Sequence, residues 1–286
     1  MLFNPILNKK LNGKKPFKFE HHQKLINLSK LKHNETNLNS ILNIWPETAF
    51  LGLFPRDKYL LKDLSLRFLN PKKNEFLFVG SISQNKNDFY NSALLLDSKS
   101  QIVDIYNKNI LVPFGEYLPL RKLFSKFNFF ENKIDFSSGH QNKAISIRNY
   151  YKFVPLICYE ILFSDLIFKS LDQDTSVIIN ITNDAWFGNT IGPIQHFLFA
   201  KIRAVEFGIP VIRVANTGYS GLVSPYGEVI EKLNFNEQGT SSFKLINKLN
   251  DTMFRKYGDY LFIILVGFTF MVSLIFKKYF QGMENS

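Results

Sequence analysis

The chain has 286 residues, a formal net charge of +11 and a hydrophobic fraction of 45%. The length fits one large or two small domains, and the hydrophobic fraction argues against an intrinsically disordered protein. Excess positive charge is one signature of nucleic-acid binding, but the sequence has no zinc-ligand spacing, helix-turn-helix pattern or aromatic RNA-binding motif. A solvated lysine-rich surface, or a basic face toward anionic phospholipid, explains the charge at least as well, so we predict no nucleic-acid partner.

Residues 1–40 are polar and rich in Lys and Asn, and we interpret them as a separate N-terminal segment. Leucines at helical spacing favour a helix within residues 19–39. The first residues contain no apolar stretch long enough for a signal peptide. A domain that works outside the cytoplasm would then need an upstream segment or another polypeptide to carry it there.

The next part of the chain predicts strands that end in polar residues. An apolar run at 41–44 ends in WPE, and because proline blocks helix continuation, Glu47 is expected at a strand-to-loop turn. Three further strands are expected at 75–82, 91–97 and 101–106. The last two form a hairpin that leads directly to Lys108, and two prolines and a glycine make residues 111–119 a structured loop.

The second half of the chain alternates buried strands with helices. Cys158, the only cysteine, ends an apolar strand at 153–157. Further elements are expected as strands at 176–181 and 210–215, a loop at 182–188, a helix at 192–207 and a hairpin at 221–230. Strands and helices that mix along one chain predict an α/β fold.

Glu47, Lys108 and Cys158 each follow a buried strand, and strand ends are where α/β folds place their ligands. A cysteine attacks well once its pKa is lowered or a base lies nearby. A carboxylate supplies that base, and an ammonium favours the thiolate and stabilises a developing oxyanion. Generic chemistry alone leaves the role open, because Glu and Lys are common and a lone cysteine is often an inert core residue.

Residues 260–276 read YLFIILVGFTFMVSLIF and carry no formal charge. Basic pairs flank the stretch, and tyrosines lie where interfacial aromatic residues would. We predict a C-terminal transmembrane helix over residues 257–278. A buried C-terminal core helix is the alternative, and basic residues at both ends leave the orientation open.

Five sequence strings carry a family resemblance, namely WPETAF, YNKNILVPFGEYLP, ICYEILFSDL, NITNDAWFGNTIGPIQH and RAVEFGIPVIRVANTGYSG. The chain resembles the nitrilase superfamily of carbon–nitrogen hydrolases, and within it the apolipoprotein N-acyltransferase family. The strings occur along this chain in the same order as in that family. The resemblance implies an α/β fold, a nitrilase-like αββα sandwich, plus one C-terminal transmembrane helix. The catalytic domain would occupy residues 41–250, and residues 1–40 would hold its shortened start.

The resemblance also implies a role for each matching residue. Glu47 would be the general base, Lys108 the oxyanion stabiliser and Cys158 the nucleophile. Three supporting residues complete the implied site, namely Glu116, Tyr159 and Glu160. Two further residues, Trp186 and Phe187, would belong to a substrate loop. No metal or cofactor is implied.

Other ionisable residues in these strings have structural interpretations. Arg203, Glu206 and Arg213 are expected to form structural salt bridges, and His196 is expected to be a hydrogen-bonded structural histidine. Glu160 is interpreted equally well as an ordinary ion-pair partner. These alternatives stay open at the level of sequence.

The implied reaction has two steps. Cys158 takes a fatty acyl group from a phospholipid and forms a thioester, which the α-amino group of a diacylglyceryl-cysteine then attacks. The partners would be a phospholipid donor, a diacylated prolipoprotein acceptor and a membrane. The enzyme would be located in the bacterial inner membrane, with the catalytic domain on its periplasmic side.

Members of this family carry several membrane helices before the catalytic domain, and none precedes it here. One expectation is a separate polypeptide that supplies these helices. A shortened, non-catalytic remnant that binds lipid or a partner is a second. A nitrilase-type amidase acting on a small amide is a third, against which the C-terminal apolar stretch argues.

Overall fold

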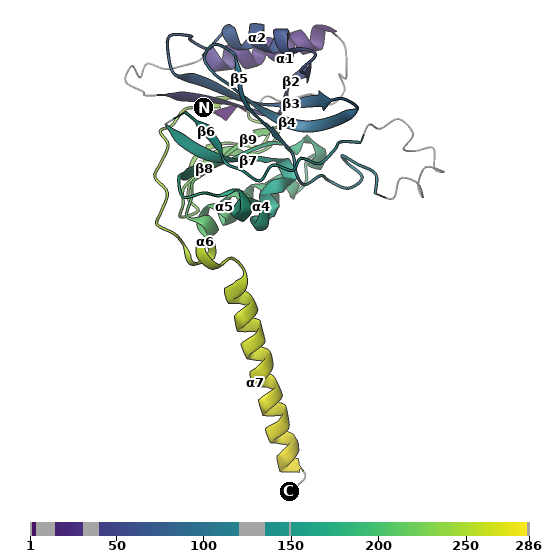
Figure 1. The fold of residues 1–286 in the computed structure, drawn as a ribbon, viewed down its shortest axis with the longest axis vertical. Coiled ribbons are helices and arrows are strands. Elements are labelled where there is room, and N and C mark those ends of the chain that lie inside the picture. Colours follow the sequence, from purple (N-terminus) through teal and green to yellow (C-terminus); the bar gives the residue numbers. More distant parts are fainter. Residues whose placement is uncertain (1, 4–14, 31–39, 120–134, 149, 285–286) are drawn as a thin grey trace, which may run out of the picture.

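Two β-sheets lie against each other in the computed structural model, which describes residues 2–3, 15–30, 40–119, 135–148 and 150–284 (Figure 1). Helices cover the outer face of each sheet, so the layers run helix, sheet, sheet, helix. This is the predicted αββα sandwich. One long helix extends away from it.

The first sheet has four strands in the order β2-β3-β4-β5. Their bounds are Ile41–Phe54, Glu75–Asn85, Asp88–Leu96 and Ile102–Asn107. Strands β2 and β3 are parallel, and the other neighbours are antiparallel. Helices α1 (Lys15–Lys30) and α2 (Lys58–Leu66) cover its outer face.

The second sheet has six strands in the order β11-β10-β9-β8-β7-β6. Their bounds are Val229–Leu233, Ser220–Val223, Val211–Asn216, Thr175–Asn183, Tyr151–Ile157 and Ile145–Ile147. Strands β7, β8 and β9 are parallel, so their carboxyl ends meet at one edge. Helices α4 (Ser164–Ser170) and α5 (Gly192–Phe207) cover the outer face of this sheet.

The central strands are apolar on both faces because each face meets a different hydrophobic cluster. Along β7, Phe153 and Ile157 point between the two sheets, whereas Val154 and Leu156 point toward α4 and α5. Between the sheets, the rings of Phe78 and Phe153 meet edge to face with centroids 5.0 Å apart. Burial on both sides explains why these strands read as continuous apolar runs.

The helix predicted within residues 19–39 is present as α1, although residues 31–39 lie outside the described part of the chain. Leu25 and Ile26 are fully buried against the first sheet. The indole Nε1 of Trp45 in β2 donates a hydrogen bond to Ser29 Oγ at 3.1 Å. Helix α1 therefore packs on the sandwich, and the boundary at residue 41 stays a prediction.

Three short elements, two strands and a helix, complete the description of the core. Strand β1 (Leu2–Phe3) pairs with β12 (Thr240–Ser241). Helix α6 (Met253–Tyr257) packs on α5 and leads into α7 (Tyr260–Glu284). Gly258, at φ 54°, separates the two helices.

Helix α7 is long and apolar enough to cross a membrane. Its window Tyr260–Lys277 has a mean hydropathy of 2.2, and none of it is buried in the protein. The alternative of a buried core helix is therefore wrong. The helix starts three residues later than the predicted residue 257, because α6 occupies that place.

Candidate active site

Glu47 lies in an irregular part of β2. The register between β2 and β3 shifts between Trp45 and Phe50, and Thr48 adopts a left-handed φ of 51°. The prediction of a strand-to-loop turn at Glu47 was wrong in detail, since β2 resumes and continues to Phe54. Proline ended the regular pairing without ending the strand.

Gly80 of β3 lies directly against this irregular segment. A Cβ at Gly80 would lie 2.5 Å from Glu47 Cα and 2.5 Å from the carbonyl oxygen of Pro46. Only glycine permits such an approach of two backbones. The position of Glu47 therefore depends on a residue of the neighbouring strand.

Lys108 follows β5 directly, and its side chain is 1% exposed. Its Nζ donates to Glu116 Oε2 at 2.7 Å, and the backbone N–H of Val112 donates to the same oxygen at 2.9 Å. The backbone N–H of Lys108 donates to the carbonyl of Asn91 at 2.8 Å. The ammonium is thus fixed by a carboxylate from the 111–119 loop.

Asn91 connects the two carboxylates. Its Nδ2 donates to Glu47 Oε1 at 2.7 Å and to Glu116 Oε1 at 2.8 Å. The other oxygen of Glu47 accepts the backbone N–H of Asn183 at 2.7 Å, across the gap between the sheets. Glu47, Glu116 and Lys108 therefore form one connected group. Sequence reasoning missed Asn91 and Asn183, although the polar side chain of Asn91 at the start of a predicted apolar strand was an available signal.

Cys158 occupies the sharp turn where β7 ends and a 3-10 helix, η2 (Cys158–Leu162), begins. Its φ is 54°, a left-handed conformation that is unusual for a residue with a Cβ. Its carbonyl oxygen accepts from Asn180 Nδ2 at 3.2 Å, and His196 Nε2 lies 3.2 Å from the same oxygen. These contacts hold the backbone of the strained turn.

Under this turn lies a buried charged network. Arg213 Nη2 donates to Asp184 Oδ2 at 2.8 Å, and His196 Nδ1 lies 2.9 Å from Asp184 Oδ1. Arg213 Nη1 also donates to Asn180. The structural interpretation of Arg213 is confirmed by this ion pair, and that of Arg203 and Glu206 by their own ion pair. His196 is a hydrogen-bonded structural histidine, as expected.

Glu160 is fully buried, and its carboxylate accepts four hydrogen bonds. Tyr106 Oη donates at 3.0 Å, and the other donors are the backbone N–H groups of Asn109, Ile110 and Ile157, at 2.6, 3.1 and 2.8 Å. The first three donors flank Lys108, and the last precedes Cys158. Glu160 thus ties the loop after the lysine to the turn of the cysteine.

The remaining predicted residues lie at the rim. Tyr159 is half-buried and meets Phe163 edge to face at 5.3 Å. Trp186 and Phe187 belong to a second 3-10 helix, η3 (Asp184–Phe187), which follows β8. The side chain of Trp186 is 69% exposed, and the Phe187 ring packs against the His196 ring.

Comparisons with known proteins agree with this architecture. Residues 17–247 match the sequence pattern of a family described as carbon-nitrogen hydrolase. The chain belongs to the carbon–nitrogen hydrolase family. Among solved structures of that fold, the carbon-nitrogen hydrolase from Helicobacter pylori G27 superposes with a TM-score of 0.60 at 17% identity, over 83% of this chain and 87% of that one.

Curated relatives within the carbon–nitrogen hydrolase family carry a more specific name. Apolipoprotein N-acyltransferase of Rickettsia prowazekii is 37% identical over 249 residues, which are 83% of this chain and 49% of that protein. The protein of the same name from Rhizobium rhizogenes is 34% identical over 256 residues, 85% of this chain and 46% of that protein. The chain thus spans about half the length of these relatives.

The charges in this carbon–nitrogen hydrolase site favour a neutral thiol at rest. Burial raises the pKa of Cys158 to about 12, the Glu47 carboxylate adds to the increase, and Lys108 opposes it. Burial also raises the pKa of Glu47, against the attraction of Lys108. Burial lowers the pKa of Lys108, but the Cys158 thiolate, once it forms, and the carboxylates of Glu47 and Glu116 outweigh this effect, so the net pKa is raised. The site therefore holds an ammonium and a weakly acidic thiol beside a carboxylate that binds protons readily.

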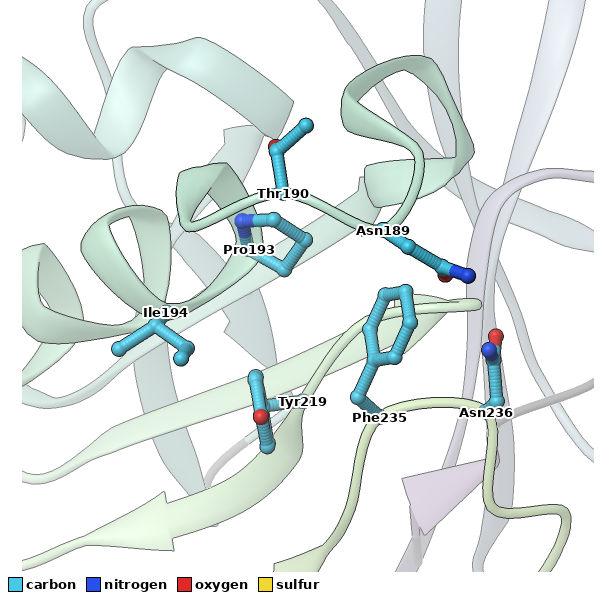
Figure 2. Close-up of a pocket in the computed structure, with 7 residues that line it drawn as sticks. All are labelled: Asn189, Thr190, Pro193, Ile194, Tyr219, Phe235 and Asn236. Carbon is cyan, nitrogen blue, oxygen red and sulfur yellow. The ribbon is translucent and has the colours of Figure 1, made fainter.

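A separate cavity of about 300 Å³ lies at the start of α5, bounded by Ile194, Tyr219 and Phe235 (Figure 2). Glu47, Lys108 and Cys158 do not line it. In the described ranges, no group of His, Cys, Asp and Glu side chains is arranged to hold a metal ion.

Proposed function

We propose that the chain is the catalytic part of an N-acyltransferase that moves a fatty acyl group from a phospholipid to the N-terminal diacylglyceryl-cysteine of a lipoprotein. The observation that carries the proposal is the connected group of Glu47, Lys108 and Glu116, in which the charges of Glu47 and Lys108 act on Cys158. Support for the substrates comes from the name of the relatives that share 33–37% of its residues.

In the first half-reaction, Glu47 takes the proton from Cys158 Sγ as the sulfur attacks the ester carbonyl of the phospholipid. The new C–S bond places negative charge on the carbonyl oxygen, which the buried ammonium of Lys108 stabilises. The C–O bond then breaks, and Glu47 returns the proton to the departing lysophospholipid hydroxyl. A base is required because the pKa of the thiol is raised to about 12.

In the second half-reaction, the α-amino group of the diacylglyceryl-cysteine attacks the thioester. Glu47 takes a proton from the attacking nitrogen, and Lys108 again stabilises the oxyanion. The C–S bond breaks, and the sulfur regains its proton from Glu47. The amide product leaves, and the enzyme returns to its starting protonation state.

Glu116 and Asn91 position the reacting groups in this scheme. The carboxylate of Glu116 fixes the Lys108 ammonium, and the amide of Asn91 orients Glu47. Tyr159 would shape the pocket beside the nucleophile. Trp186 and Phe187 would form the loop past which the acyl chain enters, in keeping with their exposure.

The proposed setting is the periplasmic face of a bacterial inner membrane. Helix α7 would anchor the chain there, and further membrane helices, which the family resemblance implies, would come from a separate polypeptide. An apolar, partly dry site would favour attack by the amine over hydrolysis of the thioester.

The test is an acyl-transfer assay in proteoliposomes. The full chain is reconstituted with phospholipid and a diacylated lipoprotein, alone and with the N-terminal membrane half of a relative, and the triacylated product is detected by mass spectrometry. We expect product with the wild-type chain and none with Cys158→Ser. Absence of product in both preparations would refute the proposal, and ammonia release from soluble amides without lipid would indicate an amidase instead.

A further inference from the structure

Helix α5 is apolar on the face that the fold leaves exposed. Five aliphatic side chains, each between 43% and 63% exposed, form what we call the α5 stripe, consisting of Ile191, Ile194, Leu198, Ile202 and Val205. Their spacing of three, four, four and three residues puts them on one side of the helix. Gln195 is the only other exposed residue between 191 and 207. Neither the core nor the candidate active site accounts for this stripe.

The opposite face of the helix is also apolar. Phe197, Ala200, Ala204 and Phe207 are buried in the cluster between α5 and the second sheet. A surface helix typically carries polar and charged side chains on the face opposite its buried apolar side chains, whereas the stripe on α5 is aliphatic. The stripe is therefore expected to be covered by something apolar in the working protein.

Aromatic residues continue the stripe at both ends. At the start of α5, the Phe187 ring lies so close to Gly192 that a Cβ there would be 2.6 Å away. At the other end, the turn that carries Tyr226 lies against Val205, because a Cβ at Gly227 would be 2.9 Å from Val205 Cγ2. Tyr226 is 70% exposed. Aromatic residues with a polar group suit the boundary between water and lipid.

The end of α5 fixes the point at which α7 leaves the core. Phe254 of α6 packs edge to face on Phe207 with ring centroids 5.4 Å apart, and Leu249 N donates to the carbonyl of Gly208 at 2.8 Å. Thr252 Oγ1 also donates to the carbonyl of Glu206. The apolar helix begins at Tyr260, six residues after Phe254, which is a rise of about 9 Å if helical.

The same layer of the sandwich faces the direction in which α7 runs. Figure 1 shows α4, α5 and α6 on the side of the core from which α7 extends, and α1 and α2 on the far side. The headgroup region on each side of a bilayer is roughly 5–8 Å thick. A bilayer spanned by α7 would therefore have its surface close to the layer that contains the stripe.

We propose that the α5 stripe rests on the lipid surface of the membrane that α7 spans, an inference that depends on the membrane attachment in the proposed function. The occupant of the stripe is thus phospholipid, and a second copy of the chain is the competing outcome. The stripe begins at the Trp186–Phe187 loop, which follows Asn183, the residue that binds Glu47. Lipid on the stripe would bring acyl donors to the rim of the active site.

The test relies on Cys158 being the only cysteine in the sequence, so that a single new cysteine can be labelled selectively once Cys158 is replaced. In a Cys158→Ala background, Leu198→Cys provides a single attachment point for an environment-sensitive fluorophore on the stripe. Leu60→Cys on α2 is the matched control, because Leu60 is 43% exposed and Leu198 is 45% exposed. Both full-length variants are reconstituted into vesicles of phosphatidylethanolamine and phosphatidylglycerol that contain a nitroxide-labelled lipid.

We expect the label at position 198 to be quenched several-fold more strongly by the nitroxide lipid than the label at position 60. Equal quenching at both positions would overturn the proposal. Self-quenching at 198 that rises with the protein-to-lipid ratio, without quenching by lipid, would show that a second copy covers the stripe and would also overturn it.

Two features of the experiment make failure of this inference distinguishable from failure of the proposed function. The background lacks the thiol, so the outcome does not depend on acyl transfer. Flotation of the vesicles is measured first, and protein that stays at the bottom of the gradient would remove the membrane attachment on which the inference rests. Lipid contact at 198 in the labelled variant, together with no acyl transfer by the wild-type chain in the proteoliposome assay, would support the stripe and refute the reaction.

Discussion

At the scale of single residues, the site depends on how three ionisable groups share charge. Lys108 is a buried ammonium whose partner is Glu116, and Glu47 is a buried carboxylate whose pKa is raised. The thiol of Cys158 is a weak acid, with a pKa raised to about 12. Attack by sulfur at neutral pH therefore requires transfer of its proton to Glu47 rather than a standing thiolate.

This arrangement predicts a pH dependence. Because only the ionised form of Glu47 can take the thiol proton, the rate of Cys158 acylation should fall as pH falls through the raised pKa of Glu47, with a midpoint above 4.5. Glu47→Gln should lower the rate roughly 10²–10⁴-fold and remove this dependence. The measurement is thioester formation by intact-protein mass spectrometry across pH, and an unchanged profile in Glu47→Gln would exclude Glu47 as the base.

The candidate residues and the supporting residue Glu116 were predicted from distinctive sequence strings, and two residues that orient Glu47, Asn91 and Asn183, were not. Glu47, Lys108 and Cys158 follow apolar runs, which is a pattern that the sequence displays. Asn91 acts through a side-chain amide in the middle of a strand, and Asn183 acts through its backbone N–H. A backbone donor has no side-chain signature, so its role emerges only when the two sheets are packed together.

At the scale of elements, the irregular part of β2 is the feature that places Glu47. The sequence predicted a strand-to-loop turn at Glu47 but could not predict that β2 continues to Phe54, because that continuation depends on pairing with β3. The strands predicted at 75–82 and 101–106 lie close to the observed Glu75–Asn85 and Ile102–Asn107. The apolar runs in these two segments made the strands recognisable in the sequence.

The close contact at Gly80 predicts a specific mutational effect. Gly80→Ala would put a methyl group 2.5 Å from Glu47 Cα, so β2 must move and carry Glu47 with it. A shift of about 1 Å in a catalytic group can lower a rate about 10²-fold. We expect this loss of acylation in Gly80→Ala, whereas the control Gly267→Ala, where no atom lies within 4 Å of the new Cβ, should retain the wild-type rate. Equal rates in both variants would contradict the assigned role of Gly80.

At the scale of the whole molecule, we expect the folding free energy of the sandwich not to depend on α7. The order of strands in each sheet could not be derived from residue patterns, because it depends on contacts between distant segments. The family resemblance predicted the αββα layering but no strand order. Helix α7 was visible from composition alone, since an uncharged apolar stretch of this length is rare in a soluble domain. None of its apolar window is buried against the core.

Removing α7 should therefore separate membrane binding from folding. A chain that ends at Gly258 should lose flotation with vesicles, while its melting temperature in detergent should stay within about 2 °C of the full chain. Gradient flotation and thermal unfolding followed by circular dichroism measure the two properties. A large drop in melting temperature would mean that α7 stabilises the sandwich by contacts other than those seen here.

The carboxylate of Glu160 has a mechanical consequence. It joins the segment that follows β5 to the turn that follows β7, so one buried side chain links the backbone beside the ammonium to the backbone beside the sulfur. Displacing one sheet along the other at this place would require breaking hydrogen bonds to a buried carboxylate, which is costly.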